Sequence, residues 1–307
     1  MSGQDRATGR EFLATAIGSG AAAAAAPALL AGMAAGQPAR GGPWQIGCYT
    51  RPWAELDYRA ALDDIAAAGF KYAGLMSAKG RTGLVISPET SIEAARQIGD
   101  EARQRGLGIL SVWGGQVPID RSIEAAGAGL RHLVEACAAA GAKSLLLVSV
   151  DDRRFYQPFF QAVAECCDYA ARQGVGLTIK PHGSLVATGP ELRKCVELVG
   201  KKNFSIFYDA GNILFYSDGK VNPVDDAAAV AGLVTGWCIK DFSDKPQKDV
   251  ALEPGTGKVD FRGVLARLKQ GGFVAGPLIV ETLAPGDRPR LIEEAKKARR
   301  FLEDLLA

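Results

Sequence analysis

Four charged residues in the second half of this 307-residue chain each end an apolar run. They are Lys180, Asp209, Lys240 and Glu281, at the ends of Gly176–Lys180, Phe204–Asp209, Gly236–Lys240 and Pro277–Glu281. Burying such charges is costly unless each one meets a partner of opposite sign. Two cations and two anions form a balanced set, and a polar residue that ends a buried strand is a first candidate for catalysis.

The four runs belong to a series of eight apolar runs, each followed by a longer amphipathic stretch. The other four are Gln45–Tyr49, Tyr72–Met76, Gly108–Val112 and Ser144–Val150. The runs are apolar on both sides, as in parallel strands that helices cover. No glycine-rich phosphate loop follows the first run, which argues against an open, doubly wound sheet. The sequence therefore predicts an α/β fold, a single closed (β/α)8 TIM barrel.

The amphipathic stretches predict the helices of this barrel. They are Tyr58–Ala68, Ser91–Arg105, Ser122–Ala140, Pro158–Gln173, Pro190–Val199, Asp260–Lys269 and Pro289–Leu306. Several end in a glycine, such as Gly69, Gly106 and Gly141, where a left-handed residue closes the last turn.

The strands of such a barrel end in a common bowl, where we expect the active site. Residues two apart on a strand face the same way, which places His182 with Lys180 and Cys238 with Lys240. The predicted catalytic residues are Lys180, His182, Asp209 and Glu281. The predicted substrate-binding residues are Lys240, Asn212, Arg51, Trp53 and Trp113.

A purely structural role is the alternative for several of these residues. Asp209 and the pair Lys240-Asp241 could form ion pairs that hold loops at the barrel rim. Arg51, Trp53 and Trp113 could serve ordinary rim packing. His132 lies in the middle of a predicted helix, so we expect it to be structural.

The first forty residues differ from the rest of the chain. Ala16 to Gly36 is uncharged and mostly Ala, Gly and Leu, which is typical of an export signal. Arg10-Glu11-Phe12-Leu13 is similar to the second half of a twin-arginine signal, although Gly9 stands where the first arginine belongs. We therefore predict that residues 1–40 are a signal peptide and linker, which is either cleaved or leaves the protein loosely tethered. The protein would then be exported to the periplasm, and residues 41–307 would form the barrel. An uncleaved membrane anchor is the alternative, but we expect no stable membrane span.

Composition narrows the partners. The formal net charge is +2 with acids and bases interspersed, so nucleic acid is not an expected partner. The six cysteines form no CxxC pair, so we predict that they are buried thiols. A disulfide is the alternative if the protein is exported. Barrels of this class often pair, so a homo-oligomer remains open.

Four short motifs near the predicted site carry a family resemblance. They are Tyr208-Asp209-Ala210-Gly211-Asn212, close to D-P-G-N, Cys238-Ile239-Lys240-Asp241, close to H-x-K-D, Gly255-Thr256-Gly257-Lys258-Val259-Asp260-Phe261, close to G-x-G-x-V-D-F, and Glu281 closing the last strand. With them, residues 45–306 resemble the xylose isomerase-like TIM barrel superfamily, in the branch of sugar phosphate isomerases/epimerases. The resemblance implies a fold and a function of that kind.

The resemblance also implies a divalent metal that polarises a sugar carbonyl, held by Glu, Asp, His and Glu on strands five to eight. Asp209 and Glu281 match two of these ligands, whereas Lys180 and Cys238 replace the other two. A protonated ammonium cannot ligate a metal, and neighbouring carboxylates favour its protonation, so Mn²⁺ or Zn²⁺ is disfavoured. Our hypothesis is that the Lys180 ammonium takes the place of the cation and stabilises an enolate.

Two alternatives to this hypothesis stay open. Lys180 could form a Schiff base with a ketose if Lys240 lowers its pKa. His182 and Cys238 could instead join the two carboxylates around zinc.

The resemblance implies a sugar isomerase or epimerase that acts on a small carbohydrate. In our hypothesis for the altered site, Glu281 or His182 is the base and Lys180 or Lys240 is the electrophilic partner. A keto-sugar lyase or hydratase of the same fold is the second choice. The third choice is a non-catalytic carbohydrate-binding protein, in which the altered site survives only as a pocket. Nothing in the sequence of the predicted barrel favours a simple scaffold.

Overall fold

The computed structural model describes residues 44–183 and 185–307. The export prediction for residues 1–40 therefore lies outside the described residues.

Eight parallel strands form a closed barrel in sequence order, and β8 pairs with β1 to close it. The strands are β1 (Trp44–Tyr49), β2 (Tyr72–Leu75), β3 (Gly108–Val112), β4 (Ser144–Leu147), β5 (Gly176–Ile179), β6 (Phe204–Tyr208), β7 (Val234–Ile239) and β8 (Gly276–Val280). The predicted (β/α)8 barrel is confirmed, and each predicted strand lies within two or three residues of an observed one.

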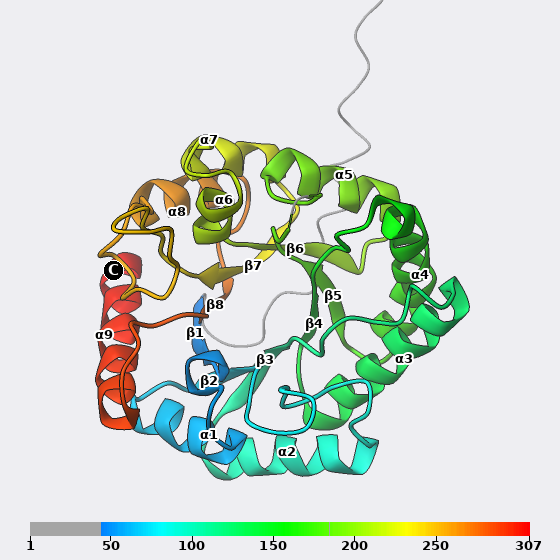
Figure 1. The fold of residues 1–307 in the computed structure, drawn as a ribbon, viewed down its shortest axis with the longest axis horizontal. Coiled ribbons are helices and arrows are strands. Elements are labelled where there is room, and N and C mark those ends of the chain that lie inside the picture. The colour runs from blue at the N-terminus through cyan, green and yellow to red at the C-terminus, as the bar shows by residue number, and fades with distance from the viewer. Residues whose placement is uncertain (1–43, 184) are drawn as a thin grey trace, which may run out of the picture.

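The helices surround the barrel as an outer ring (Figure 1). They are α1 (Tyr58–Ala67), α2 (Ile92–Gln104), α3 (Ile123–Ala140), α4 (Arg153–Arg172), α5 (Gly189–Val199), α6 (Ala210–Tyr216), α7 (Pro223–Asp226), α8 (Phe261–Gln270) and α9 (Arg288–Leu306), with 3₁₀ turns η1 (Arg51–Trp53) and η2 (Ala227–Val230). Helix α4 begins five residues before its predicted start at Pro158. The reason is that the Asp152 side chain caps the helix by accepting the N–H of Arg154 at 2.9 Å, so Pro158 falls inside it.

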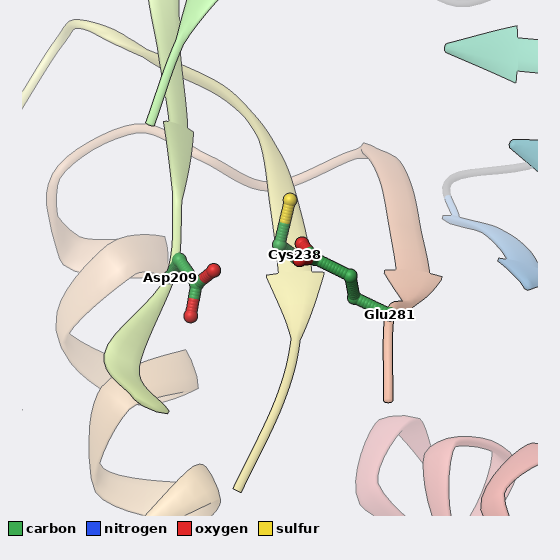
Figure 2. Close-up of side chains that lie close together, drawn as sticks. All are labelled: Asp209, Cys238 and Glu281. Atoms are coloured by element: carbon green, nitrogen blue, oxygen red, sulfur yellow. The ribbon is translucent and has the colours of Figure 1, made fainter. Parts of the chain in front are cut away.

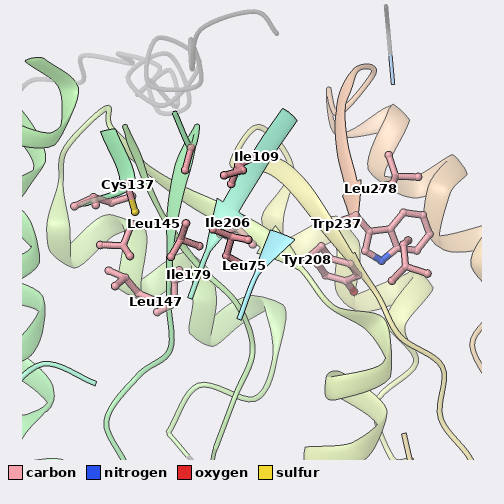
Figure 3. Close-up of a cluster of buried hydrophobic side chains, with 14 of the residues drawn as sticks. Leu75, Ile109, Cys137, Leu145, Leu147, Ile179, Ile206, Tyr208, Trp237 and Leu278 are labelled. Carbon is pink, nitrogen blue, oxygen red and sulfur yellow. The ribbon is translucent and has the colours of Figure 1, made fainter. Parts of the chain in front are cut away.

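Two apolar clusters hold the barrel. The larger one fills the space between strands and helices and includes Leu75, Ile179 and Trp237 (Figure 3). The smaller one fills the barrel interior with Tyr49, Met76, Leu110, Leu146, Phe207, Cys238 and Ile279. Gly74 makes room for the Tyr49 ring, since a Cβ at this position would lie 2.2 Å from Tyr49 Cδ1. The filled interior leaves the carboxyl ends of the strands as the floor of a bowl.

All six cysteines are buried and free, which confirms the prediction of buried thiols. Across the described residues, no helix has the length and apolar character that crossing a membrane requires.

Candidate active site

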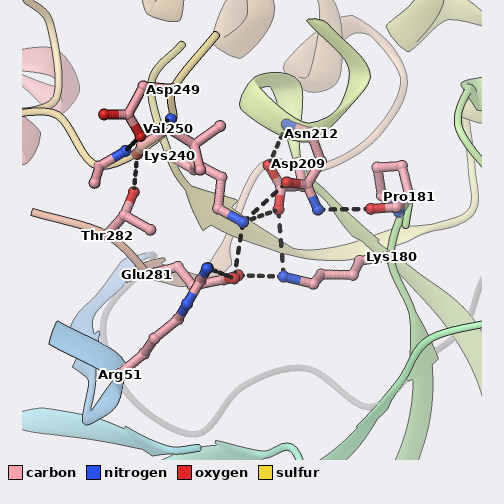
Figure 4. Close-up of polar contacts among 11 residues, drawn as sticks. Arg51, Lys180, Pro181, Asp209, Asn212, Lys240, Asp249, Val250, Glu281 and Thr282 are labelled. Carbon is pink, nitrogen blue, oxygen red and sulfur yellow. Dashed lines mark hydrogen bonds and ion pairs between the residues drawn. The ribbon is translucent and has the colours of Figure 1, made fainter. Parts of the chain in front are cut away.

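The four charged residues at the strand ends meet in one buried cluster. Each is the first residue after its strand, from β5 to β8 in order. The Lys240 ammonium lies 2.8 Å from Glu281 Oε1 and 3.5 Å from Asp209 Oδ2. The Lys180 ammonium lies 3.4 Å from Asp209 Oδ2 and also contacts Glu281 (Figure 4). None of the four is more than 3% exposed, so the charges satisfy one another inside the protein.

Arg51 adds a third cation to this cluster. It begins η1, directly after β1, and its Nη1 donates to Glu281 Oε1 at 2.7 Å. Unlike the two lysines, its side chain is 39% exposed. Figure 4 shows Arg51 reaching Glu281 from the β1 side. The cluster therefore holds three cations and two carboxylates.

Asn212 ties the cluster to the segment after β6. The Asp209 carboxylate caps α6 by accepting the backbone N–H of Asn212 at 2.9 Å. The Asn212 side chain accepts from Lys240 at 2.9 Å and donates to the carbonyl of Pro181 at 2.8 Å. Gly211 is required between them, because a Cβ there would lie 2.6 Å from the Lys240 carbonyl oxygen. The sequence Asp209-Ala210-Gly211-Asn212 thus positions both lysines.

Burial and neighbouring charges shift the pKa values of the cluster in different directions. Burial opposes ionisation of Glu281, but Lys180, Lys240 and Arg51 outweigh it and lower the Glu281 pKa well below its ordinary value. Burial likewise opposes protonation of Lys180, yet Glu281 and Asp209 help raise the Lys180 pKa above its ordinary value. Lys180 and Glu281 are therefore a charged pair at neutral pH.

The pKa values of Lys240 and Asp209 shift in the direction that favours their neutral forms. Burial lowers the pKa of Lys240, because the attraction of Asp209 and Glu281 only partly offsets it. Burial raises the pKa of Asp209, although Lys240 and Lys180 act in the opposite direction. The charge of the cluster is concentrated on Lys180, Glu281 and Arg51.

His182 follows Lys180 at the end of β5 and carries a neutral ring. Burial, with Lys180 and Lys240 nearby, lowers the pKa of His182 to about 4. Its ring centroid lies 5.2 Å from that of Tyr216 on α6. A neutral imidazole can accept a proton at pH 7, which an imidazolium cannot.

A cavity of about 350 Å³ opens above the cluster. It is lined by Arg51, Met76, Ser77, Trp113, Val148, Lys180, His182, Asn212, Phe215, Tyr216, Lys240, Val250 and Glu281. Asp209 does not line it and lies beneath, against the lysines. Of the nine predicted site residues, seven line this cavity.

Trp53 is the predicted residue that the structure does not bring to the cavity. Its ring is 1% exposed and belongs to the larger apolar cluster, because η1 directs it into the layer between barrel and helices. Trp113, at the end of β3, does line the cavity. His132 lies outside the cavity and its ring Nε2 is 2.8 Å from the Thr90 carbonyl oxygen, which fits its structural prediction.

Asp241 holds a loop, as the structural alternative predicted, but not through the ion pair that this alternative expected. The structure gives it no salt bridge among the described residues; its carboxylate accepts backbone N–H groups instead. They belong to Phe242, Gly255, Gly257 and Val259, at 2.8, 2.9, 2.8 and 3.1 Å. This one buried side chain thus binds four backbone groups of the loop between β7 and α8, which brings Val250 to the cavity. The signal was the glycine-rich motif that follows Asp241 in the sequence.

Three potential metal ligands lie side by side in the cluster. One ligand atom from each of Asp209, Cys238 and Glu281 lies within 4.8 Å of the others (Figure 2). As arranged, the set does not fit a divalent ion, because the Lys180 and Lys240 ammonium groups bind both carboxylates. Burial also raises the Cys238 pKa well above its ordinary value, which keeps the sulfur a thiol rather than a ligating thiolate.

Residues 62–305 match the family model described as xylose isomerase-like TIM barrel, which spans most of the chain. The chain belongs to the xylose isomerase-like TIM barrel family. No curated protein matches it by sequence.

Solved structures share this barrel at low sequence identity. A xylose isomerase domain protein from Planctomyces limnophilus is 18% identical with a TM-score of 0.66, over 85% of this chain and 97% of that one. A D-psicose 3-epimerase solved with D-fructose is 15% identical with a TM-score of 0.66, over 85% of this chain and 99% of that one. A 3-keto-D-glucoside 4-epimerase from E. coli is 14% identical with a TM-score of 0.63, over 84% of this chain and 99% of that one. At such identities the likeness shows the fold.

Proposed function

We propose that this protein is a sugar isomerase or epimerase in which the Lys180 ammonium stands where relatives hold a metal. The observation that carries the proposal is the contact of Lys180 with both Asp209 and Glu281, the two residues at the family's ligand positions. The sugar epimerases among the structural neighbours support the general reaction type.

The reaction would be proton transfer next to a carbonyl. A base removes a proton from the carbon beside the sugar carbonyl, and the electron pair moves onto the carbonyl oxygen to give an enediolate. Returning the proton to the neighbouring carbon, while the hydroxyl proton passes from one enediol oxygen to the other, gives an isomer; returning it to the opposite face of the original carbon gives an epimer. Every proton and electron pair is accounted for without another reactant.

The cluster suits the charge that develops on that oxygen. An ammonium has three N–H donors, and Asp209 and Glu281 accept two from Lys180, which leaves one for the substrate. The charge is fixed before the substrate arrives, so it needs no rearrangement during the reaction. We assign the base to His182, because it lines the cavity as a neutral ring, whereas three cations bind Glu281.

Proton exchange in heavy water tests the proposal without knowledge of the product. Purified protein is incubated with a panel of ketoses in heavy water, and NMR measures the deuterium that each sugar takes up. We expect deuterium to enter at a carbon next to the carbonyl. Lys180→Met should lower the exchange rate about 10²–10³-fold, the usual effect of losing one oxyanion donor. Glu281→Gln should lower it as well, since it releases Lys180.

The matched control is Lys201→Met, which removes a half-exposed lysine paired with Asp168 away from the cavity. It should leave exchange unchanged. Exchange that survives Lys180→Met intact would refute the assignment. Binding of sugars without any exchange would instead favour the non-catalytic carbohydrate-binding protein.

Export by residues 1–40 is a separate proposal that rests on their alanine-rich, uncharged run. Fractionation of a bacterial host followed by mass spectrometry of the amino terminus would test it. A full-length cytoplasmic product would contradict it.

A further inference from the structure

The cavity has more positive than negative charge at its floor. Arg51, Lys180 and Lys240 line it as cations, whereas Glu281 is the one carboxylate among the described lining residues and Asp209 lies just beneath. The sum is +1 when all five groups are charged, and it stays +1 when a proton passes from Lys240 to Asp209, the two groups that burial shifts toward their neutral forms. A neutral sugar gives this surplus charge no partner.

Arg51 is the cation that carries the surplus. The residues Lys180 and Lys240 are only 2–3% exposed, and carboxylates bind their ammonium groups. Arg51 is instead 39% exposed, and within residues 44–183 and 185–307 its guanidinium makes one hydrogen bond, from Nη1 to Glu281. A guanidinium has five N–H donors in a planar fork, so four remain for a ligand.

The backbone around Arg51 is fixed. Thr50 Oγ1 donates to the Ser77 carbonyl at 2.9 Å and accepts the Met76 N–H at 3.0 Å, which locks the end of β1 to the end of β2. Ser77 also lines the cavity, so this link lies at the cavity wall. A rigid support of this kind keeps an arginine fork in place before the ligand binds.

We propose that the substrate of this site is an acidic sugar and that Arg51 binds its carboxylate. The inference rests on the proposed function, because it names the substrate class for the same cavity. A planar guanidinium matches a carboxylate edge to edge. A phosphate ester fits less well, since no glycine among residues 44–183 and 185–307 lines the cavity to supply the backbone N–H cradle that phosphate sites use.

The rest of the cavity suits the body of a single sugar. Its lining includes three aromatic residues, Trp113, Phe215 and Tyr216, and a ring of this kind can pack against the apolar face of a sugar ring. A volume of about 350 Å³ is near the lower end for ligand pockets, roughly 300–1,000 Å³, and favours a monosaccharide.

Matched sugar pairs test the inference by calorimetry. D-fructose and D-fructuronate differ only in a terminal CH₂OH or carboxylate, as do D-tagatose and D-tagaturonate. We expect the acid of at least one pair to bind about 10- to 100-fold more tightly than its neutral partner, the range for a charge-assisted hydrogen bond. D-fructose 6-phosphate serves as the phosphate arm and should bind more weakly than the preferred acid.

Arg51→Gln should reduce the preference to less than about 3-fold, whereas Arg51→Lys, which keeps the charge without the fork, should retain part of it. Arg96→Gln is the control, since it removes an exposed arginine from α2. Circular dichroism establishes that each variant is folded, and Arg51→Lys provides the test if Arg51→Gln is not.

The outcomes separate this inference from the proposed function. Equal binding within both pairs, tighter binding of the phosphate, or no binding by any probe would overturn the acidic substrate. Exchange on neutral ketoses with no preference for acids would leave the proposed function standing alone. Arg51-dependent binding of an acid without exchange would leave the acid site standing and the proposed function refuted.

Discussion

Replacing Lys180 by glutamate should turn the cluster into a divalent metal site. Wild type holds Arg51, Lys180 and Lys240 against Asp209 and Glu281, a sum of +1. Lys180→Glu exchanges one cation for one anion, so the sum becomes −1. Three carboxylates would then surround the position that the ammonium occupied, and hard oxygen ligands suit Mn²⁺.

The cost and the gain can both be bounded. Removing one partner of a buried ion pair costs about 3–5 kcal/mol, so metal-free Lys180→Glu should unfold at a lower temperature than wild type. Mn²⁺ at 100 times its Kd stabilises the folded state by about 2.7 kcal/mol. At about 2–4 °C for each kcal/mol in a domain of this size, we expect Mn²⁺ to raise the Tm by about 5–10 °C.

Differential scanning fluorimetry with and without Mn²⁺ measures both effects. Lys180→Met is the matched control, because it also removes the ammonium but adds no ligand; Mn²⁺ should shift its Tm by less than about 1 °C. Wild type should likewise not respond. If wild type and Lys180→Glu gain the same stability from Mn²⁺, the ammonium does not exclude the ion and the reasoning fails.

Two further predictions concern groups around the cluster. The pKa of His182 lies below its ordinary 6.5, at about 4, so the unfolded chain binds more protons between these values and stability should fall as pH drops from 6.5 to 4. The loss in the free energy of unfolding is about 1–2 kcal/mol after allowance for partial exposure. Urea unfolding at pH 7 and pH 4.5 measures this loss, and it should be smaller in His182→Gln; an equal loss in the variant and wild type would contradict the lowered pKa. Asp241→Asn should cost about 2–4 kcal/mol, because an amide keeps only one acceptor oxygen for the N–H groups of Gly255, Gly257 and Val259. Limited proteolysis should then cut residues 242–260 faster, and a loop as resistant as in wild type would argue against the Asp241 anchor.

The barrel could be predicted from the sequence because its strands are apolar on both faces. Runs such as Ser144–Val150 and Tyr72–Met76 leave no polar face, and that pattern requires helices on one side and a filled barrel on the other. Lys180 and Glu281 could be placed together for the same reason: each ends its strand, and strands of a closed parallel barrel end at one rim. Position along a strand was enough for these residues.

Contacts made by turns and loops could not be read in the same way. Arg51 and Glu281 are 230 positions apart, and the sequence gives no sign that a guanidinium after β1 bends toward β8. Trp53 lies two residues further, where the 3₁₀ turn η1 points its ring into the core instead. Asp241 binds backbone N–H groups, which every residue except proline carries, so apart from the glycines Gly255 and Gly257 no residue type marks its partners.

The central claim is that a fixed ammonium does the work of a metal in this site. The direct measurement is the rate of deuterium exchange into the preferred sugar by wild type before and after exhaustive treatment with a chelator. The account predicts the same rate in both samples. Loss of exchange on chelation, with recovery when Mn²⁺ or Zn²⁺ is returned, would contradict it.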